Sequence, residues 1–400
     1  MTMTYPTQSN KTTDIINKQR RNLMQLAAMV AMYPLTGCGG GGSANAEPAP
    51  APTPSPAPAP ASKFYVPDEN TPHTRTWMAW PASDIIWGSQ LAGIQTDIAL
   101  LARTIAKYEP VYMVVNGTNN ASIAQSMIGT TPFPVTLIPT IANDDCWMRD
   151  TGAVFRKDGA GNLNCFGLNF NGWGNHQTHA NDALVAKQVA AYLGLNFTAS
   201  TVVGEGGGVV EDGEGTLLAN ESSWVNANRN PGLTRDQIEA ELLKQYSATK
   251  MIWCKGVIGQ DVTDDHCDAT VMFTQPGTVV VHVPDAADND AFAANAAQWL
   301  QTLSTSTDAK GRAFNIIKLQ APKAATATTL ASYINMCVTN NAVINVAIGA
   351  ICNDPAKDVA VKVQLAAAYP GRTVEMLNLP TLYGSGGGGI HCVTQQQPVP

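Results

Sequence analysis

The chain has 400 residues, of which 44% are apolar and 14% are charged. This balance is typical of a folded protein with a large core, and it excludes disorder for most of the chain. The net charge of −7 would repel a phosphate backbone, so the sequence indicates no nucleic-acid partner and favours a cationic ligand.

Residues 1–37 have the pattern of an export signal. Basic residues precede an apolar run, Leu23–Tyr33, which is far shorter than the roughly 20 residues needed to span a bilayer. The run leads into Leu-Thr-Gly-Cys, which ends at Cys38 and resembles the lipobox of bacterial lipoproteins. This resemblance implies cleavage before Cys38 and attachment of lipid to its thiol; an ordinary secretory signal with a chance cysteine is the alternative. The sequence thus predicts an exported bacterial lipoprotein, anchored to a membrane and either periplasmic or at the cell surface.

Residues 38–62 are rich in glycine, proline and alanine and have almost nothing to bury. Alternating Ala and Pro favour an extended, polyproline-like conformation, so this segment is predicted to be a flexible tether. One folded domain is therefore expected over residues 63–400.

Helix and strand signals alternate from there on. Apolar residues at helical spacing predict a helix that ends before Pro110, and Val111–Val115 is predicted to be a buried strand. The spaced residues are Ile94, Ile98, Leu101, Ile105 and Tyr108.

Two further helices are predicted in the middle of the chain. One covers Asp182–Leu193, with its inward face formed by Leu184, Val185, Val189 and Tyr192. The other opens at Thr234, where Gln237 completes the pattern of a capping box. The class predicted is α/β.

Three stretches each place a polar residue before a strand, a tight turn and a second strand. Asp150 precedes a turn at Asp158-Gly159, and Glu205 precedes a turn at Asp212-Gly213. His266 and Asp268 precede a turn at Pro276-Gly277. Together with Trp77–Pro81 and Cys392, the spacing indicates five ββαβ modules of about 65 residues. Such repeats favour a radial arrangement in which the polar residues converge on one axis.

These polar residues suit nucleophilic attack on a planar cation. A cysteine nucleophile needs a base or cationic neighbour, and Cys392 with His266 and either Glu205 or Asp268 supplies those groups. Asp150 and Asp268 are candidates to clamp a guanidinium, whose forked donors match carboxylates. No metal site is predicted. The alternatives are that Cys392 is an inert buried thiol and that the carboxylates are strand-edge or surface groups.

Several motifs resemble those of one family. These are PHTRTWMAWP (72–81), NDDCWMRDTGAVF (143–155), GEGGG (204–208), GEGTLLANESSWVNANRNP (213–231), SYIN (332–335), YPGR (369–372) and GGGGIHCVTQQ (386–396). They are similar to the agmatine deiminase family, which also contains the bacterial peptidyl-arginine deiminases, and the match covers roughly residues 65–397. The resemblance implies the five-bladed α/β propeller, or pentein, of the guanidine-modifying enzymes.

The resemblance also implies roles for the site residues. Cys392 would attack the guanidino carbon and form a covalent thiouronium, while His266 would protonate the departing ammonia and then activate water. Asp150 and Asp268 would hold the guanidinium nitrogens. Glu205 would orient His266, and Trp147 would wall the pocket, whereas His391 is expected to be structural. No cofactor is expected, because water is the second substrate.

The substrate implied is agmatine, which would yield N-carbamoylputrescine and ammonia. Peptidyl-arginine is the first alternative, and a non-catalytic surface binder of guanidinium or polyamine ligands is the second. The sequence does not predict the oligomeric state.

Three features depart from the family pattern: Asp265, Cys146 where the family more often has a small polar residue, and the stretch at residues 174–183. The family has glycine before its histidine, where this chain has Asp265, and that carboxylate could raise the pKa of His266 or attract a second cation. Besides Cys38 and Cys392, the chain has six cysteines, which permit three disulfides or free core thiols: Cys146, Cys165, Cys254, Cys267, Cys337 and Cys352.

Overall fold

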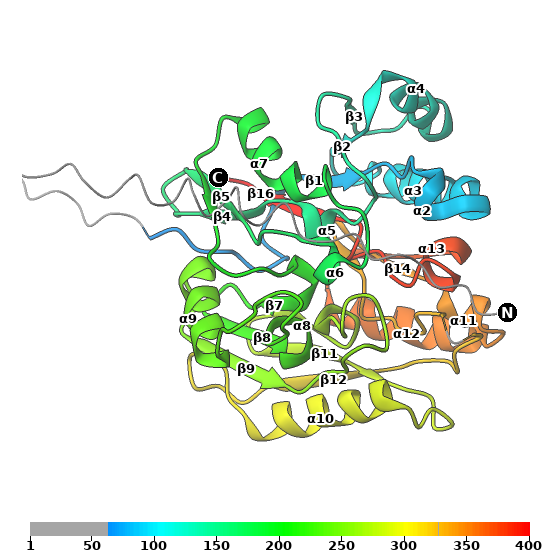
Figure 1. The fold of residues 1–400 in the computed structure, drawn as a ribbon. Helices are drawn as coiled ribbons and strands as arrows, with labels where there is room; N and C mark the ends of the chain where they lie inside the picture. Colours follow the sequence, from blue (N-terminus) through cyan, green and yellow to red (C-terminus); the bar gives the residue numbers. More distant parts are fainter. Residues whose placement is uncertain (1–62, 327) are drawn as a thin grey trace, which may run out of the picture. The chain divides into compact units, whose positions relative to one another are not determined.

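The computed structural model describes residues 63–326 and 328–400 (Figure 1). The predicted export signal, the lipid-modified Cys38 and the tether lie outside these residues. Within the described part, no helix combines the length and the apolar character needed to cross a membrane.

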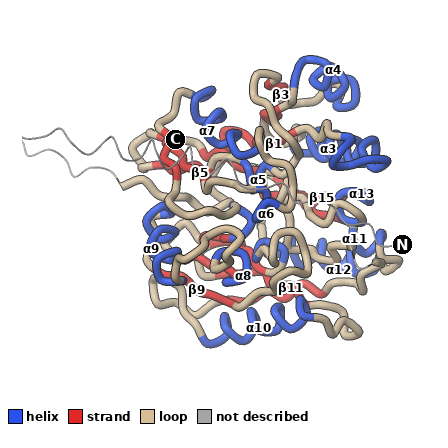
Figure 2. The backbone as a smooth tube through the Cα atoms, in the orientation of Figure 1, coloured by secondary structure: helices blue, strands red, loops and turns tan. Residues whose placement is uncertain are grey.

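The strands of the described residues form five small sheets (Figure 2). In four of them the first two strands form an antiparallel hairpin, and the third lies parallel to the second. These sheets are β4 (Val154–Lys157), β5 (Leu163–Gly167) and β6 (Phe197–Ala199); β7 (Val209–Glu211), β8 (Thr216–Asn220) and β9 (Lys250–Cys254); β10 (Val271–Gln275), β11 (Thr278–Val283) and β12 (Asn315–Gln320); β13 (Cys337–Val338), β14 (Ala342–Val346) and β15 (Thr373–Leu377). The prediction of five ββαβ modules and of an α/β fold is confirmed.

The remaining sheet joins the two ends of the domain. Its order is β16-β1-β2-β3, with β1 at His73–Ala79, β2 at Val111–Val114, β3 at Val135–Ile138 and β16 at Gln395–Pro398. Strand β16 is antiparallel to β1, with Thr76 opposite Gln396 (red beside blue in Figure 1). The C-terminal segment therefore supplies the first strand of the first module and closes the ring of modules.

Helices connect the parallel strands and flank the site. They are α2 (Asp84–Trp87), α3 (Leu91–Ile105), α4 (Gly117–Ile128), α5 (Met148–Thr151), α6 (Gly172–Asn175), α7 (Asp182–Leu193), α8 (Glu221–Trp224), α9 (Arg235–Tyr246), α10 (Ala291–Thr305), α11 (Ile348–Ile351), α12 (Pro355–Ala368) and α13 (Pro380–Gly384), with short 3₁₀ turns η1 (Gly88–Gln90), η2 (Gly206–Gly208) and η3 (Cys267–Ala269). The capping box at Thr234 and Gln237 is present in both directions and starts α9, as predicted.

The predicted inward face of α7 is partly wrong. Val185 and Val189 are buried, but Leu184 and Tyr192 are each 48% exposed. Alanines 186 and 190 take their places against the sheet. The buried stripe is therefore narrower and displaced around the helix, because small side chains let the helix pack closely.

The core is built from fully buried strands and from aromatic side chains. Every residue of β14 is buried, as expected for a strand covered on both faces. Trp77 and Trp80 are completely buried. The six cysteines that could have formed disulfides are free thiols, and five of them are buried.

Candidate active site

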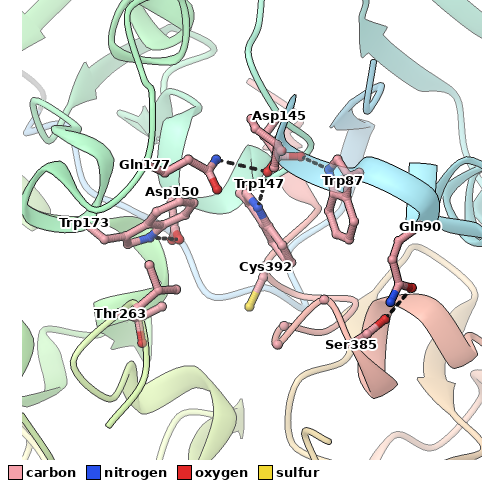
Figure 3. Close-up of a pocket in the computed structure, with 15 residues that line it drawn as sticks. Trp87, Gln90, Asp145, Trp147, Asp150, Trp173, Gln177, Thr263, Ser385 and Cys392 are labelled. Atoms are coloured by element: carbon pink, nitrogen blue, oxygen red, sulfur yellow. Dashed lines mark hydrogen bonds between the residues drawn. The ribbon is translucent and has the colours of Figure 1, made fainter. Parts of the chain in front are cut away.

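The site residues occupy equivalent places in the modules. Each stands in the turn that leads into the first strand of its module: Asp150 in α5 before β4, Glu205 before η2 and β7, His266 and Asp268 at η3 before β10, Asn335 before β13, and Cys392 before β16. Their side chains meet beside a cavity of about 230 Å³, which Asp150, Trp147 and Cys392 line (Figure 3). The structure thus brings together the six residues singled out from the sequence, and adds Asn335; the six are Trp147, Asp150, Glu205, His266, Asp268 and Cys392.

His266 is held by a buried carboxylate. Its Nε2 atom lies 3.2 Å from Glu205 Oε2, and the Nε atom of Arg229 contacts both oxygens of Glu205, at 2.9 and 3.0 Å. Burial alone would lower the pKa of His266, but the charges of Asp150 and Glu205 raise that pKa to about 9. The imidazole is therefore positively charged near neutral pH, and it is able to donate a proton.

Asp150 is fixed at both carboxylate oxygens. Oδ2 accepts from Trp173 Nε1 at 3.0 Å, and Oδ1 accepts from the backbone N–H of Gly207 at 3.0 Å. Burial, more than the neighbouring charge of Glu205, raises the pKa of Asp150 to about 6. A bound cation would favour the ionised form of this carboxylate.

Two polar atoms of the site are buried without a hydrogen-bond partner among the described residues. They are His266 Nδ1 and Asp268 Oδ1. A buried, unpaired polar atom is costly unless a ligand or water satisfies it. Both atoms belong to side chains that surround Gly207, where an added Cβ would lie 2.7 Å from His266 Nδ1 and 3.0 Å from Asp268 Oδ2. Gly207 in the GEGGG motif therefore keeps this space open.

The thiol of Cys392 faces a carboxylate and an amide. Sγ lies 3.6 Å from Asp268 Oδ2 and accepts from Asn335 Nδ2 at 3.2 Å. Burial first, and then the charges of Asp268 and Asp150, raise the pKa of Cys392 well above its ordinary value. The sulfur is thus protonated near neutral pH, and a cation placed between it and the carboxylates would favour the thiolate.

The glycine run before Cys392 allows close packing. A Cβ at Gly388 would clash with the indole of Trp147, and one at Gly389 would clash with the Asn335 amide. Gly387 has a φ of 71°, which favours glycine. These residues let the loop lie flat against the pocket wall and bring Cys392 into the site.

A collar of three indoles surrounds the cavity. Trp87 and Trp147 are stacked with ring centroids 6.2 Å apart, and Trp173 meets Trp147 edge-on at 6.4 Å. Trp173 lies within a run of four residues with positive φ, Gly172 to Asn175, which forms a left-handed turn. Such a conformation costs about 1–2 kcal/mol for each non-glycine residue, so the surrounding contacts must hold it.

A network of charged side chains connects Asp268 with His391, Glu69 and Arg149. The two ring nitrogens of His391 lie 2.7 Å from Asp268 Oδ2 and 2.8 Å from Glu69 Oε1. Arg149 is 3.2 Å from the same oxygen of Glu69. Although burial acts the other way, the charges of His391 and Arg149 lower the pKa of Glu69 to about 2. The contact with His391 orients the carboxylate of Asp268. The structural role expected for His391 therefore includes holding a carboxylate of the site.

Asp265 does not contribute a second cation site to the cavity. Its Oδ2 atom accepts from Asn295 Nδ2 of α10 at 2.7 Å, and it is absent from the lining of the cavity. Its φ of 69° explains why glycine suits this position. The principal charges that raise the pKa of His266 are those of Asp150, Glu205 and Asp268. Asp265 is therefore not the main cause of the raised pKa.

Sequence reasoning missed four residues that shape the site: Arg229, Asn335, Trp173 and Asp145. Asn335 had a usable signal, because it precedes the first strand of the fifth module as the other site residues do in theirs. Arg229 lies inside a matched motif, but its partner Glu205 is distant in the chain. No pattern in the sequence pairs the two.

A five-module α/β fold that gathers a cysteine, a histidine and carboxylates at one cavity defines the class of the guanidine-modifying hydrolases. The profile of the Porphyromonas-type peptidyl-arginine deiminases matches residues 65–398. The agmatine deiminase of Stutzerimonas stutzeri is 32% identical over 365 residues, which cover 84% of this chain and 96% of that protein. The chain belongs to the agmatine deiminase family, which includes these peptidyl-arginine deiminases.

Solved structures agree with this assignment. The agmatine deiminase of Enterococcus faecalis superposes with a TM-score of 0.74 at 26% identity, over 84% of this chain and 96% of that one. The C. jejuni agmatine deiminase with substrate bound has a TM-score of 0.71 at 20% identity, over 84% and 96% of the two chains, and so supports the fold.

Proposed function

We propose that this protein hydrolyses the guanidino group of agmatine, giving N-carbamoylputrescine and ammonium. The observation that carries the proposal is the grouping of the Cys392 thiol, the charged His266 and the carboxylates of Asp150 and Asp268 beside one cavity. The names of the relatives support the same activity.

In the first half-reaction, Asp150 and Asp268 bind the guanidinium, whose single positive charge offsets part of theirs. The thiol of Cys392 then loses its proton to solvent, because the adjacent cation lowers its pKa. The sulfur forms a bond to the guanidino carbon, giving a tetrahedral adduct. His266 donates its proton to one nitrogen, the C–N bond breaks, and ammonia leaves a cationic thiouronium on Cys392.

In the second half-reaction, neutral His266 takes a proton from water. The resulting hydroxide bonds to the thiouronium carbon, and the C–S bond then breaks to return the thiolate. The carbon becomes the carbonyl of a substituted urea. The proton released in this step combines with the ammonia to form ammonium. Agmatine and one water are thereby converted with charge and atoms balanced, and no cofactor takes part in these steps.

The lining of the cavity favours agmatine over arginine. It contains the carboxylates Asp145 and Asp150 and no lysine, arginine or histidine, so no cationic side chain of the lining would form an ion pair with the α-carboxylate of arginine. The cavity of about 230 Å³ lies below the range of roughly 300–1,000 Å³ typical of drug-sized ligands, which suits a small diamine-like molecule.

The direct test is release of ammonia by the purified protein with agmatine, free arginine and an arginine-containing peptide. Agmatine should be preferred, and Cys392→Ala should be inactive. Cys352→Ala is the matched control, because among the described residues Cys352 is the other partly buried free thiol, and it lies outside the cavity. Activity that survives in Cys392→Ala contradicts the mechanism. Preference for the peptide would assign a protein substrate, and inactivity on all three would favour a guanidinium or polyamine binder.

We propose also that Cys38 carries lipid and anchors the protein outside the cytoplasm. The support is the basic, apolar and Leu-Thr-Gly-Cys pattern of residues 1–38. Metabolic labelling with a palmitate analogue should mark the protein, and Cys38→Ala should abolish the label. An unlabelled protein with an intact N-terminus would refute the anchor.

A further inference from the structure

The buried carboxylate of Asp145 accepts hydrogen bonds from three side chains that line the cavity. Its side chain is 1% exposed. Oδ1 accepts from Trp87 Nε1 at 2.7 Å and from the backbone N–H of Cys146 at 2.8 Å. Oδ2 accepts from Trp147 Nε1 at 2.8 Å and from Gln177 Nε2 at 3.1 Å. Figure 3 shows the two indoles and the amide turned toward this carboxylate.

The partners of Asp145 come from separate parts of the domain. Trp87 ends α2 in the first module, Trp147 precedes α5 in the second, and Gln177 follows α6. The loop that carries Asp145 is fixed independently, because Asn143 Nδ2 donates to Asp145 O at 2.9 Å and to Trp80 O at 2.9 Å. Asp145 therefore links its own loop to two distant segments, because Trp87 lies 58 residues before it and Gln177 lies 32 residues after it.

The carboxylate has no capacity left for a substrate. Four donors occupy its two oxygens, and the distances are those of good hydrogen bonds. All three indole N–H groups of the collar are also used, since Trp173 donates to Asp150. The collar thus presents aromatic surface to the substrate, while its polar edges point away into the protein.

Trp147 is confined on its other side as well. The Gly388 backbone lies so close to its ring that a Cβ there would clash, and Trp87 stacks against it at an interplanar angle of 28°. Rotation of either indole would change the width of the cavity. Together with these contacts, the hydrogen bonds to Asp145 fix the direction of both rings.

We propose that Asp145 is a positioning residue that sets the selectivity of the site for the substrate's tail. By fixing the indoles of Trp87 and Trp147, it shapes the neck of the cavity for an unbranched alkyl chain and against the wider backbone of a polypeptide. The inference rests on the proposed deiminase function and names the part of the site that would distinguish agmatine from peptidyl-arginine.

The test compares Asp145→Asn with the unaltered protein on four substrates. These are agmatine, its homologues shorter and longer by one methylene, and an arginine-containing peptide. Asparagine keeps the size of the side chain but has only one acceptor oxygen, so one indole N–H is released. The KM for agmatine should rise about tenfold with kcat changed less than about threefold, and discrimination among the four should shrink, as expected when one buried hydrogen bond is lost.

A second readout separates positioning from general damage. 2-Chloroacetamidine carries the amidine head without a tail, so it should alkylate Cys392 in Asp145→Asn within about twofold of the normal rate, because the clamp of Asp150 and Asp268 is unchanged. Trp87→Phe keeps the ring and removes the N–H, and it should loosen tail selectivity in the same direction. Asp290→Asn is the control, since Asp290 caps α10 away from the cavity.

An unchanged substrate profile in Asp145→Asn would overturn the inference, and so would an equal loss of agmatine turnover and of alkylation. Failure of the proposed function looks different, because the unaltered protein would then release no ammonia from any of the guanidines.

Discussion

Asn335 contacts Cys392 twice. Its Nδ2 atom donates to Cys392 Sγ at 3.2 Å, and its Oδ1 atom accepts from the Cys392 backbone N–H at 3.2 Å. The second contact fixes the amide, so that its donor rather than its acceptor faces the sulfur. The side chain thereby favours the thiolate in a site where burial and carboxylates oppose it.

Loss of this contact should slow the formation of the reactive sulfur. Asn335→Ala should reduce the rate of Cys392 alkylation by 2-chloroacetamidine about tenfold to a hundredfold, the usual worth of a hydrogen bond to a charged group. Asn335→Asp should react more slowly still, because a third carboxylate, besides Asp268 and Asp150, raises the thiol pKa further. Mass spectrometry of the alkylated protein measures both rates, and normal rates in both variants would contradict this role.

Arg229 should contribute strongly to stability. It is completely buried and binds Glu205 and Asp264, the latter at 2.8 Å. Arg229→Ala would leave buried carboxylates unpaired and should lower the free energy of unfolding by about 3–5 kcal/mol. Urea titration checks this value. Arg235→Ala is the matched control, because Arg235 is 48% exposed in its ion pair with Glu221 and should cost less than about 1 kcal/mol. Similar losses in both variants would contradict the assignment.

The pH dependence of kcat/KM should be bell-shaped. As pH falls through about 6, Asp150 takes up a proton and loses the charge that binds the guanidinium. As pH rises through about 9, His266 loses the proton that it would donate to ammonia. Since Glu205 raises the pKa of His266, Glu205→Gln should move the upper limb to lower pH. An upper limb that stays in place would assign it to another group.

Gly388 should tolerate no side chain. A Cβ there would clash with the Trp147 ring, so Gly388→Ala should displace the indole and lower kcat/KM for agmatine at least about tenfold, in line with the roughly 1–3 kcal/mol cost of overpacking. Gly384→Ala is the control, since Gly384 ends α13 just before this loop and a Cβ there meets no atom within 4 Å. Steady-state kinetics on the two variants should differ clearly, and equal activities would refute the close approach.

Local patterns were sufficient to predict the modules and their polar turns. Pro110, the Asp-Gly turns and the capping box at Thr234 act over a few residues, so the sequence reveals them directly. The converging site followed from the repeat, because equivalent positions in a ring of modules face one axis.

Contacts between distant segments were not predictable in this way. Asp145 looks like an ordinary loop carboxylate until Trp87 is seen to donate to it across 58 residues of chain. Leu184 has the right period for the core but lies on the exposed side of α7, because buried alanines set the packing there. The spacing of apolar residues predicts one face of the helix, whereas packing against other elements determines which part of that face is buried.

The pairing of β16 with β1 has a consequence for the timing of synthesis. Strand β16, which closes the ring, follows Cys392 by only a few residues, so both are synthesised after His266 and the site carboxylates. A chain that stops before Cys392 would contain His266, Asp150 and Asp268 but would lack both the thiol and strand β16. Cys392 would therefore be present only in a chain that can also form the pairing of β16 with β1. A reactive thiol is thus not exposed on a chain whose ring cannot close.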